Sequence, residues 1–242
     1  MLKRLFFFSI FTYSYLFSLG TLAENIAVVT EDAPSLQYQN ASGEMAGPAA
    51  TLVEKVLHES GLNFNTRVLP WARAYKEAKQ TPNTLIYSIV RTPEREDDFY
   101  WIGIISKPQY YLFALKSNDI PSKKPLTEYK QYHVGTVLNS ASYIALKKQD
   151  FESLIPVATA KQVFMLLTKK RVDLITANLT AFDEICQHNT DQCNDIEAIG
   201  PISSLNNRAL YFAMNKNSDA NTVQTLRETY QKLLNDKAIN IL

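Results

Sequence analysis

The two cysteines are the residues whose spacing most directly suggests chemistry. Cys186 and Cys193 enclose a six-residue polar segment that contains His188. Two thiols at this spacing can close a short disulfide loop, or they can bind a metal ion together with the imidazole of His188. The metal alternative takes three ligands from one loop, and no fourth ligand is evident nearby in the sequence. The choice depends on the compartment, and therefore on how the chain begins.

The first 23 residues have the pattern of a secretory signal peptide. The basic pair Lys3-Arg4 precedes an apolar stretch over 5–19, and Thr21 and Ala23 supply small residues for cleavage. An uncleaved membrane anchor is the alternative, but the apolar stretch is shorter than the roughly 20 residues that a spanning helix needs. We therefore predict export to the periplasm, where disulfides persist, and a Cys186–Cys193 disulfide in preference to a metal site.

No set of residues in the sequence assembles a convincing catalytic centre. Nucleophile-elbow, His-Glu-x-x-His and glycine-rich phosphate-binding motifs are all missing from it. His58, His133 and His188 have no evident partner for general-base chemistry. We therefore expect a protein that is not an enzyme and that uses no cofactor and no metal.

The composition is that of an ordinary globular protein. The 242 residues are 46% hydrophobic and 20% charged, which argues against intrinsic disorder. The formal net charge is +1, and no basic run is longer than Lys169-Lys170-Arg171. A nucleic-acid partner is therefore not expected, because binding to phosphates needs clustered positive charge.

Short β-rich runs alternate with amphipathic helical runs along the chain after residue 23, which is typical of an α/β fold. The expected strands are 25–30, 64–69, 85–90, 110–116, 133–137, 172–177 and 209–214. The expected helices are 48–60, 71–80, 140–149, 161–170, 179–187 and 222–234. Pro48 and Gly61 suit the two ends of the first helix, and Thr159 suits the N-cap of the fourth.

Two blocks of this pattern lie on either side of the polar loop 117–128, and the final segment is too small to fold alone. We predict one lobe made of 24–112 with 208–242 and a second lobe made of 113–207. Two segments would cross between the lobes, near 110–116 and 206–211. A cleft between such lobes is a favoured place for a small ligand.

Four stretches of the sequence resemble the family 3 extracellular solute-binding proteins, the periplasmic receptors of polar amino acid ABC transporters. They are Gly43–Gly47, Ser88–Arg95 followed by Phe99, His133–Val137 and Lys170–Leu174. They occur in the expected order, and the resemblance covers 24–242. It implies the two-lobed periplasmic-binding-protein fold of type II, in which each lobe is a mostly parallel sheet flanked by helices and two segments cross between the lobes.

The resemblance also implies a ligand site in the cleft. Arg95 stands where the family places an arginine for an anionic group, and a guanidinium fork matches a carboxylate. The alternative for Arg95 is a surface salt bridge with Glu94 or Glu96. Ser88 and Ser140 would contribute hydroxyl groups from opposite sides of the cleft. Ser140 also opens a helix, so its alternative is a simple N-cap.

Four further residues complete the predicted ligand set. Trp71 would form an aromatic wall and Tyr110 would line the crossing region, each with core packing as the alternative. Asn178 occupies the place where many amino-acid binders carry an Asp for the ligand ammonium; an amide can accept a hydrogen bond there but brings no charge. Asp32 is the nearby acid that would replace it. The absence of a charged Asp at position 178 points away from an ordinary α-amino acid as the ligand.

The sequence therefore predicts a monomeric periplasmic protein that captures a small polar organic ligand, an amino acid or a related carboxylate or amine. The expected partner is an ABC permease in the inner membrane. Two alternatives remain. One is a dehydratase of the same fold that acts on a prephenate-like acid, with Glu31 or Asp32 as the general acid. The other is a ligand-binding subunit for a sensor kinase.

Overall fold

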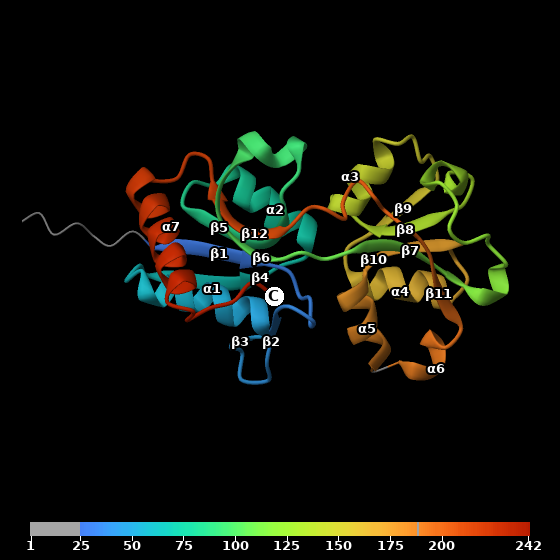
Figure 1. Cartoon of the computed structure of the whole chain (residues 1–242), viewed down its shortest axis with the longest axis horizontal. Helices are drawn as coiled ribbons and strands as arrows, with labels where there is room; N and C mark the ends of the chain where they lie inside the picture. The colour runs from blue at the N-terminus through green and yellow to red at the C-terminus, as the bar shows by residue number, and fades with distance from the viewer. Residues whose placement is uncertain (1–24, 188) are drawn as a thin grey trace, which may run out of the picture.

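A computed structural model describes residues 25–187 and 189–242, and it divides them between two five-stranded sheets in separate bodies (Figure 1). The predicted signal peptide lies outside the described residues. Among the described residues, no helix is long and apolar enough to cross a membrane.

The first sheet has the strand order β4-β1-β5-β12-β6. Its strands are β1 (Ile26–Thr30), β4 (Phe64–Val68), β5 (Thr84–Val90), β6 (Phe99–Ser106) and β12 (Leu210–Asn215). Helices α1 (Pro48–Glu59) and α7 (Ala220–Asn235) pack in one apolar cluster on this sheet, and α2 (Trp71–Gln80) packs in another. A small hairpin of β2 (Tyr38–Gln39) and β3 (Met45–Ala46) precedes α1, and the 3-10 segment η1 (Pro93–Asp98) follows β5.

The second sheet has the strand order β11-β7-β10-β8-β9. Its strands are β7 (Tyr110–Leu115), β8 (Val134–Val137), β9 (Leu154–Val157), β10 (Leu174–Asn178) and β11 (Ile196–Pro201). Its helices are α3 (Ala141–Lys147), α4 (Ala160–Thr168), α5 (Leu179–Gln187) and α6 (Thr190–Cys193), and the 3-10 segments η2 (Lys116–Asn118) and η3 (Leu126–Tyr129) follow β7. Thr159 caps α4 with its side chain and forms a capping box with Gln162, so the predicted N-cap is confirmed.

In each sheet four strands run in one direction and one strand runs against them. The reversed strand is β12 in the first sheet, between β5 and β6, and β7 in the second sheet, between β10 and β11. Each reversed strand is the one that arrives from the other sheet. The predicted fold of two mostly parallel sheets flanked by helices is therefore confirmed.

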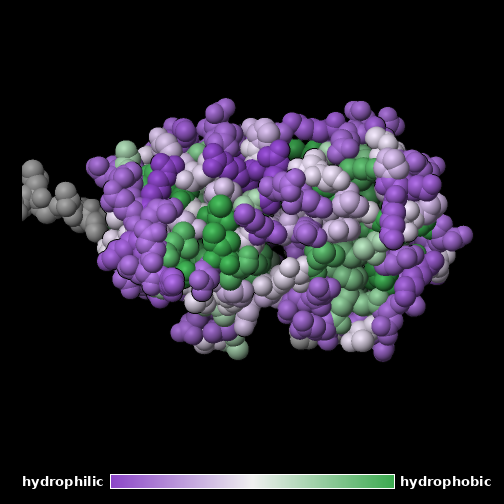
Figure 2. Space-filling view, in the orientation of Figure 1, coloured by the Kyte–Doolittle hydropathy of each residue, from purple (hydrophilic) through white to green (hydrophobic). Residues whose placement is uncertain are grey.

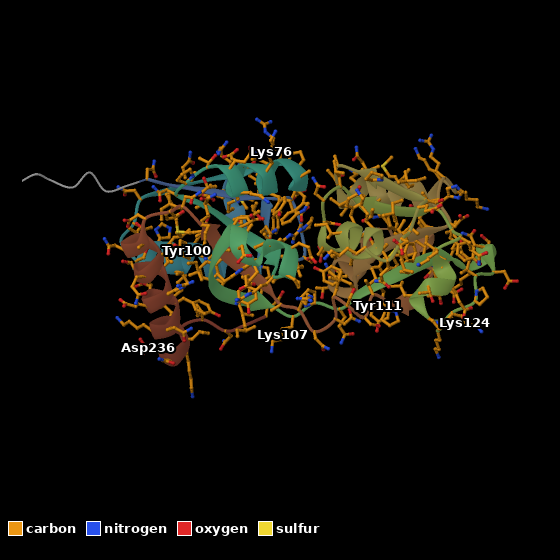
Figure 3. The ribbon with its side chains drawn as sticks, turned by 90° about the horizontal axis from the view of Figure 1, so that it is seen from above. Lys76, Tyr100, Lys107, Tyr111, Lys124 and Asp236 are labelled. Carbon is orange, nitrogen blue, oxygen red and sulfur yellow. A yellow bond between two sulfur atoms is a disulfide. The ribbon has the colours of Figure 1, made fainter. Side chains whose placement is uncertain are left out.

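The chain passes between the sheets twice, over 107–109 and over 202–209. Figure 3 shows Lys107 at the first passage and Tyr111 on the second body. The first passage comes before the predicted crossing at 110–116, because β7 pairs with β10 and β11 along its length and belongs to the second sheet. We propose to divide the chain along these sheets: the first lobe is 25–106 with 210–242, and the second lobe is 110–201.

Candidate ligand-binding site

A cavity of about 140 Å³ lies between the two lobes, and we call it the inner cavity. It adjoins a larger space of about 660 Å³, the outer groove, and the two share Glu31, Asp32, Trp71, Phe164 and Ile185 among their lining residues. Figure 2 shows the two bodies with a narrow waist between them and apolar residues on both sides of it. Both lobes therefore contribute to one continuous cleft.

The structure brings all seven predicted ligand residues to the inner cavity. Asp32, Trp71, Ser88 and Arg95 come from the first lobe. Tyr110, Ser140 and Asn178 come from the second lobe. Their placement together follows from the topology, because they lie at strand ends and helix starts on the facing edges of the two sheets. The binding of a ligand by these residues stays a prediction.

Arg95 is fully buried at the edge of the first lobe. Its Nη1 donates to the Val90 carbonyl at 3.1 Å and its Nη2 donates to the Asn139 carbonyl at 3.0 Å. Its guanidinium carbon lies 5.3 Å from the ring centre of Trp71 and 4.9 Å from that of Tyr75. Burial lowers the pKa of Arg95, and the two aromatic faces offset part of the cost of burying the cation.

The surface salt bridge considered for Arg95 is wrong. Glu94 pairs with Lys148 of the second lobe, and Glu96 pairs with Arg91. These lysine and arginine partners hold the pKa of both carboxyl groups below their usual values, that of Glu94 at about 2. The buried Nε of Arg95 has no hydrogen-bond partner among the described residues.

The Asn139 carbonyl joins the two lobes beside the cavity. It accepts hydrogen bonds from Trp71 Nε1 at 2.9 Å and from Arg95 Nη2 at 3.0 Å. Asn139 has a φ of 59°, the left-handed region that asparagine tolerates better than most residues. Trp71 is 4% exposed and packs in the first-lobe apolar cluster. Trp71 therefore lines the cavity and packs in the core at the same time, so the two alternatives for it are compatible.

Ser88 faces the cavity from a β-bulge in β5. It lies between Tyr87 and Ile89, opposite the register shift in β12, and its φ is 61°. Bulges commonly redirect a side chain next to a functional site. The Ser88 hydroxyl donates to Gln37 Oε1 at 2.7 Å, and Gln37 Nε2 donates to the Glu31 carbonyl at 3.2 Å. The hydroxyl proton is thus occupied, and Ser88 can only accept a further hydrogen bond.

Two carboxyl groups follow β1 at the same wall. Glu31 is half-buried and Asp32 is exposed. Burial, followed by the negative charge of Asp32, raises the pKa of Glu31 to about 7, and Arg95 opposes this rise. Tyr110 begins β7 opposite Asn178, and burial together with the Glu31 charge raises its pKa well above the usual value. The sequence considered Glu31 only as a general acid, not as part of the ligand set.

Ser140 and Asn178 are both helix caps. Ser140 Oγ accepts from Tyr143 N at 3.1 Å and so caps α3, which confirms the N-cap alternative while the side chain also lines the cavity. Asn178 Oδ1 accepts from Ala181 N at 2.8 Å at the start of α5. The cap uses one of the two lone pairs of this oxygen, so Asn178 offers a ligand its amide N–H groups and one further acceptor position. The expectation that Asn178 accepts from an ammonium group stays a prediction.

Most of the rest of the second-lobe wall is apolar. Val163 and Phe164 come from α4, Ile175 from β10, and Phe182 and Ile185 from α5. Among the described second-lobe residues that line the inner cavity, none carries a formal charge. The sequence predicted Val163 and Phe164 as an inner helix face, and it gave no signal that this face would reach the cleft.

The predicted disulfide between Cys186 and Cys193 is present, with the Cα atoms 5.5 Å apart. It ties the end of α5 to the end of α6, one residue beyond the cavity-lining Ile185. A disulfide leaves no thiolate for the metal alternative, and His188 lies outside the described residues.

No protein-family model and no curated protein matches the chain. Many solved structures share its fold. A histidine kinase sensor domain with similarity to periplasmic binding proteins has a TM-score of 0.77 at 15% identity over 88% of this chain and 92% of its own. The substrate-binding protein of an amino acid ABC transporter has a TM-score of 0.75 at 14% identity, over 88% and 95%.

The arginine-, lysine-, histidine-binding protein ArtJ from Geobacillus stearothermophilus has a TM-score of 0.71 at 16% identity, over 89% of this chain and 91% of its own. These likenesses confirm the periplasmic-binding-protein fold of type II, the fold of the family 3 solute-binding proteins that the sequence motifs resemble. At identities this low they establish the fold and not the ligand.

Proposed function

We propose that the chain is an exported solute-binding protein that captures a small organic ligand by closing its two lobes over the inner cavity. The observation that carries this proposal is the Asn139 carbonyl, which binds Trp71 and Arg95 across the cleft at the cavity itself. Contacts at that position can exist only when the lobes are together. A ligand in the cavity would be enclosed by both lobes and removed from water.

The polar end of the ligand would lie against the first lobe. Arg95 offers positive charge, Ser88 offers hydroxyl lone pairs, and Glu31 and Asp32 offer negative charge. A zwitterion or an amine would be matched there, because each charged group on the ligand would find an opposite one. A purely anionic ligand would be opposed by the two carboxyl groups.

A thermal-shift screen of amino acids, amines and small carboxylates tests the proposal. A ligand that binds only the folded protein stabilises it by about 2.7 kcal/mol at one hundred times its dissociation constant. Hits would be confirmed by calorimetry and repeated with Arg95→Lys, which keeps the charge but loses the planar fork. We expect weaker binding in that variant. Absence of any hit across the three classes would contradict the proposal.

The histidine kinase sensor domain that shares this fold supports a second candidate role. In that role the captured ligand would signal to a kinase and would not be transported. Uptake of the identified ligand by membrane vesicles that hold a candidate permease, with and without this protein, separates the two roles. Cell fractionation tests the periplasmic location, and light scattering tests the expected monomer.

The raised pKa of Glu31 supports the dehydratase alternative, because a carboxyl group that is half protonated near pH 7 suits a general acid. Turnover of a cyclohexadienyl acid, lost in Glu31→Gln, would replace binding with catalysis as the function. We favour binding, since the compared structures with stated ligands are binding proteins.

A further inference from the structure

We infer that the ligand is amphipathic, with an apolar alkyl or aryl body that seats on Phe164, Phe182 and Ile185 and thereby completes the second-lobe core. This inference rests on the proposed function and names the ligand class for the same site. It differs from the sequence prediction of a small polar ligand, because it places an apolar part of the ligand against the second-lobe wall.

Helix α5 has an apolar face that the protein alone does not cover. Leu179, Phe182 and Ile185 recur at helical spacing on this face, and each is only half-buried. None of the nine residues of α5, all of them described, is fully buried. By contrast, α1 buries six of its residues. An apolar face left partly open beside a cavity gains free energy when another apolar surface covers it.

The cavity wall is continuous with the apolar core of the second lobe. Val163, Phe164 and Ile175 are buried members of that cluster, and Phe182 and Ile185 pack at its margin. Phe182 stacks on Phe113, with ring centres 4.1 Å apart. The cavity is thus a gap in a core, and a polar occupant would have to give up its water there without compensation.

Several polar groups on this wall are already engaged. Asn178 Oδ1 and Ser140 Oγ cap helices, and Thr176 Oγ1 donates to Thr136 Oγ1 at 3.1 Å. What remains toward the cavity is a small number of neutral polar groups, Ser142 among them, and no charge. A charged group at the far end of the ligand would therefore lack a counter-charge, whereas a methylene chain or a ring would not need one.

The size of the space limits the occupant. The inner cavity of about 140 Å³ is too small for a segment of another protein, and the outer groove beyond it includes Lys161 and Lys169 among its lining residues. Of the three seat residues, Phe182 lines only the inner cavity, whereas Phe164 and Ile185 line both spaces, so the seat ends where the inner cavity meets the outer groove. We expect it to hold a body of a few carbon atoms and to stop gaining affinity when the body reaches the charged groove.

Two homologous series test the inference by calorimetry. One is glycine, alanine, 2-aminobutyrate, norvaline and norleucine, and the other is ethylamine to hexylamine. Affinity should rise about fourfold for each methylene that enters the cavity, the value for burying one such group, and then level off. Norleucine should bind more tightly than glutamine, which has a similar length and a polar end.

Matched variants test whether the rise in affinity with chain length depends on α5. Ile185→Thr keeps the branched shape but puts a hydroxyl into the wall, and it should flatten the rise with chain length. Ile144→Thr makes the same change at a half-buried position on α3 that lines neither the inner cavity nor the outer groove, and it should leave the rise intact. Circular dichroism of both variants verifies that they fold.

The outcomes separate the inference from the proposed function. Binding that is flat or weakens along both series, or that favours glutamine over norleucine, overturns the amphipathic ligand while leaving a solute-binding protein. An equal slope in Ile185→Thr and the wild type overturns the assignment to α5. Binding by no member of either series and no hit in the wider screen overturns the proposed function, and the inference with it.

Discussion

The two lobes have the same sheet topology but opposite cavity walls. Each sheet places its reversed strand fourth when counted from the edge strands β4 and β9. The first lobe lines the inner cavity with Glu31, Asp32 and Arg95, whereas the second lobe lines it with uncharged and largely apolar side chains. A shared fold therefore fixes where the ligand lies, and the two walls separately fix which end of it each lobe takes.

The walls also differ in how they are held. Arg95 is buried, bonded to two carbonyls and in contact with two aromatic rings, so its position is set by many partners. Part of the second-lobe wall depends on α5, which has no fully buried residue among its described positions and is tied by one disulfide. We expect the first wall to be rigid and the second to adapt, and the following variants test that difference.

Replacing Arg95 with alanine should have the largest effect. The change removes charge-assisted hydrogen bonds to Val90 and Asn139 and leaves a void beside the rings of Trp71 and Tyr75. Hydrogen bonds of this kind contribute about 1.5–3 kcal/mol each, so we expect a loss of about 3–6 kcal/mol in the free energy of unfolding. Urea denaturation measures it.

The matched control for Arg95→Ala is Arg73→Ala on the exposed face of α2. Surface changes of this kind usually stay within about 0.5 kcal/mol. Similar losses in the two variants would show that the first wall is no more firmly held than the surface.

Polar residues of both walls were visible in the sequence, whereas the apolar part of the second wall was not. Ser88 and Arg95 stand in one family-like stretch, and Trp71 and Asp32 lie at ends of predicted elements, so a motif and an element boundary sufficed to place them. The bulge and the left-handed φ of Ser88 were not visible, because they arise from pairing with β12, which lies far along the chain.

The fold beyond the motifs was predicted in part. Helices α2 and α5 begin and end as predicted. Their starts have local signals, because Pro70 precedes α2 and Asn178 caps α5. Strands β6, β9 and β11 were not predicted. Strand β9 is only four residues long and contains Pro156, and β11 is defined by its pairing with β7. Sequence periodicity also identified Phe164 as inward-facing without showing that the core it faces is open.

The pH dependence of stability should come mainly from the charged wall. The pKa of Glu31 is raised to about 7 in the folded protein from 4.5. Between these values the unfolded chain releases the proton while the folded protein keeps it. Stability therefore falls as pH rises through this range, by up to about 3 kcal/mol, and is level above pH 7 with respect to this group.

Glu31→Gln should remove this dependence and make the variant more stable than the wild type at pH 8. Urea denaturation at pH 5 and pH 8 gives the difference between the two proteins. Glu59→Gln, at the exposed end of α1, is the control and should follow the wild type at both values. A Glu31→Gln variant with the wild-type pH slope would contradict the assignment.

Removing the disulfide should weaken the second wall selectively. The cysteines are seven residues apart, and a loop of this length is worth about 2–3 kcal/mol on the chain-entropy account. We expect the Cys186→Ser, Cys193→Ser double variant to lose that amount. Amide exchange should quicken in α5 and stay unchanged in α2. Dithiothreitol should lower the stability of the wild type and leave the double variant unaffected, which controls for effects of the reductant.

Asn178→Asp should have the smallest effect on stability and the most direct effect on the contrast between the walls. Asp keeps the side-chain oxygen that accepts from Ala181 N, and a negative charge at a helix N-terminus is favourable by about 0.3–1 kcal/mol. Stability should therefore change little, whereas Asn178→Ala should lose about 1 kcal/mol with the cap.

The charge that Asn178→Asp introduces would be the first on the second-lobe wall of the inner cavity, among the residues described there. A ligand whose body is apolar should then bind more weakly, because the carboxylate needs water or a cation beside it. A diamine such as cadaverine should gain over pentylamine, since its second ammonium group would meet that carboxylate. Calorimetry of the two amines on the wild type and the variant measures the exchange of preference. If the ratio of their affinities does not move, the second wall does not contact the far end of the ligand, and the difference between the lobes has no part in recognition.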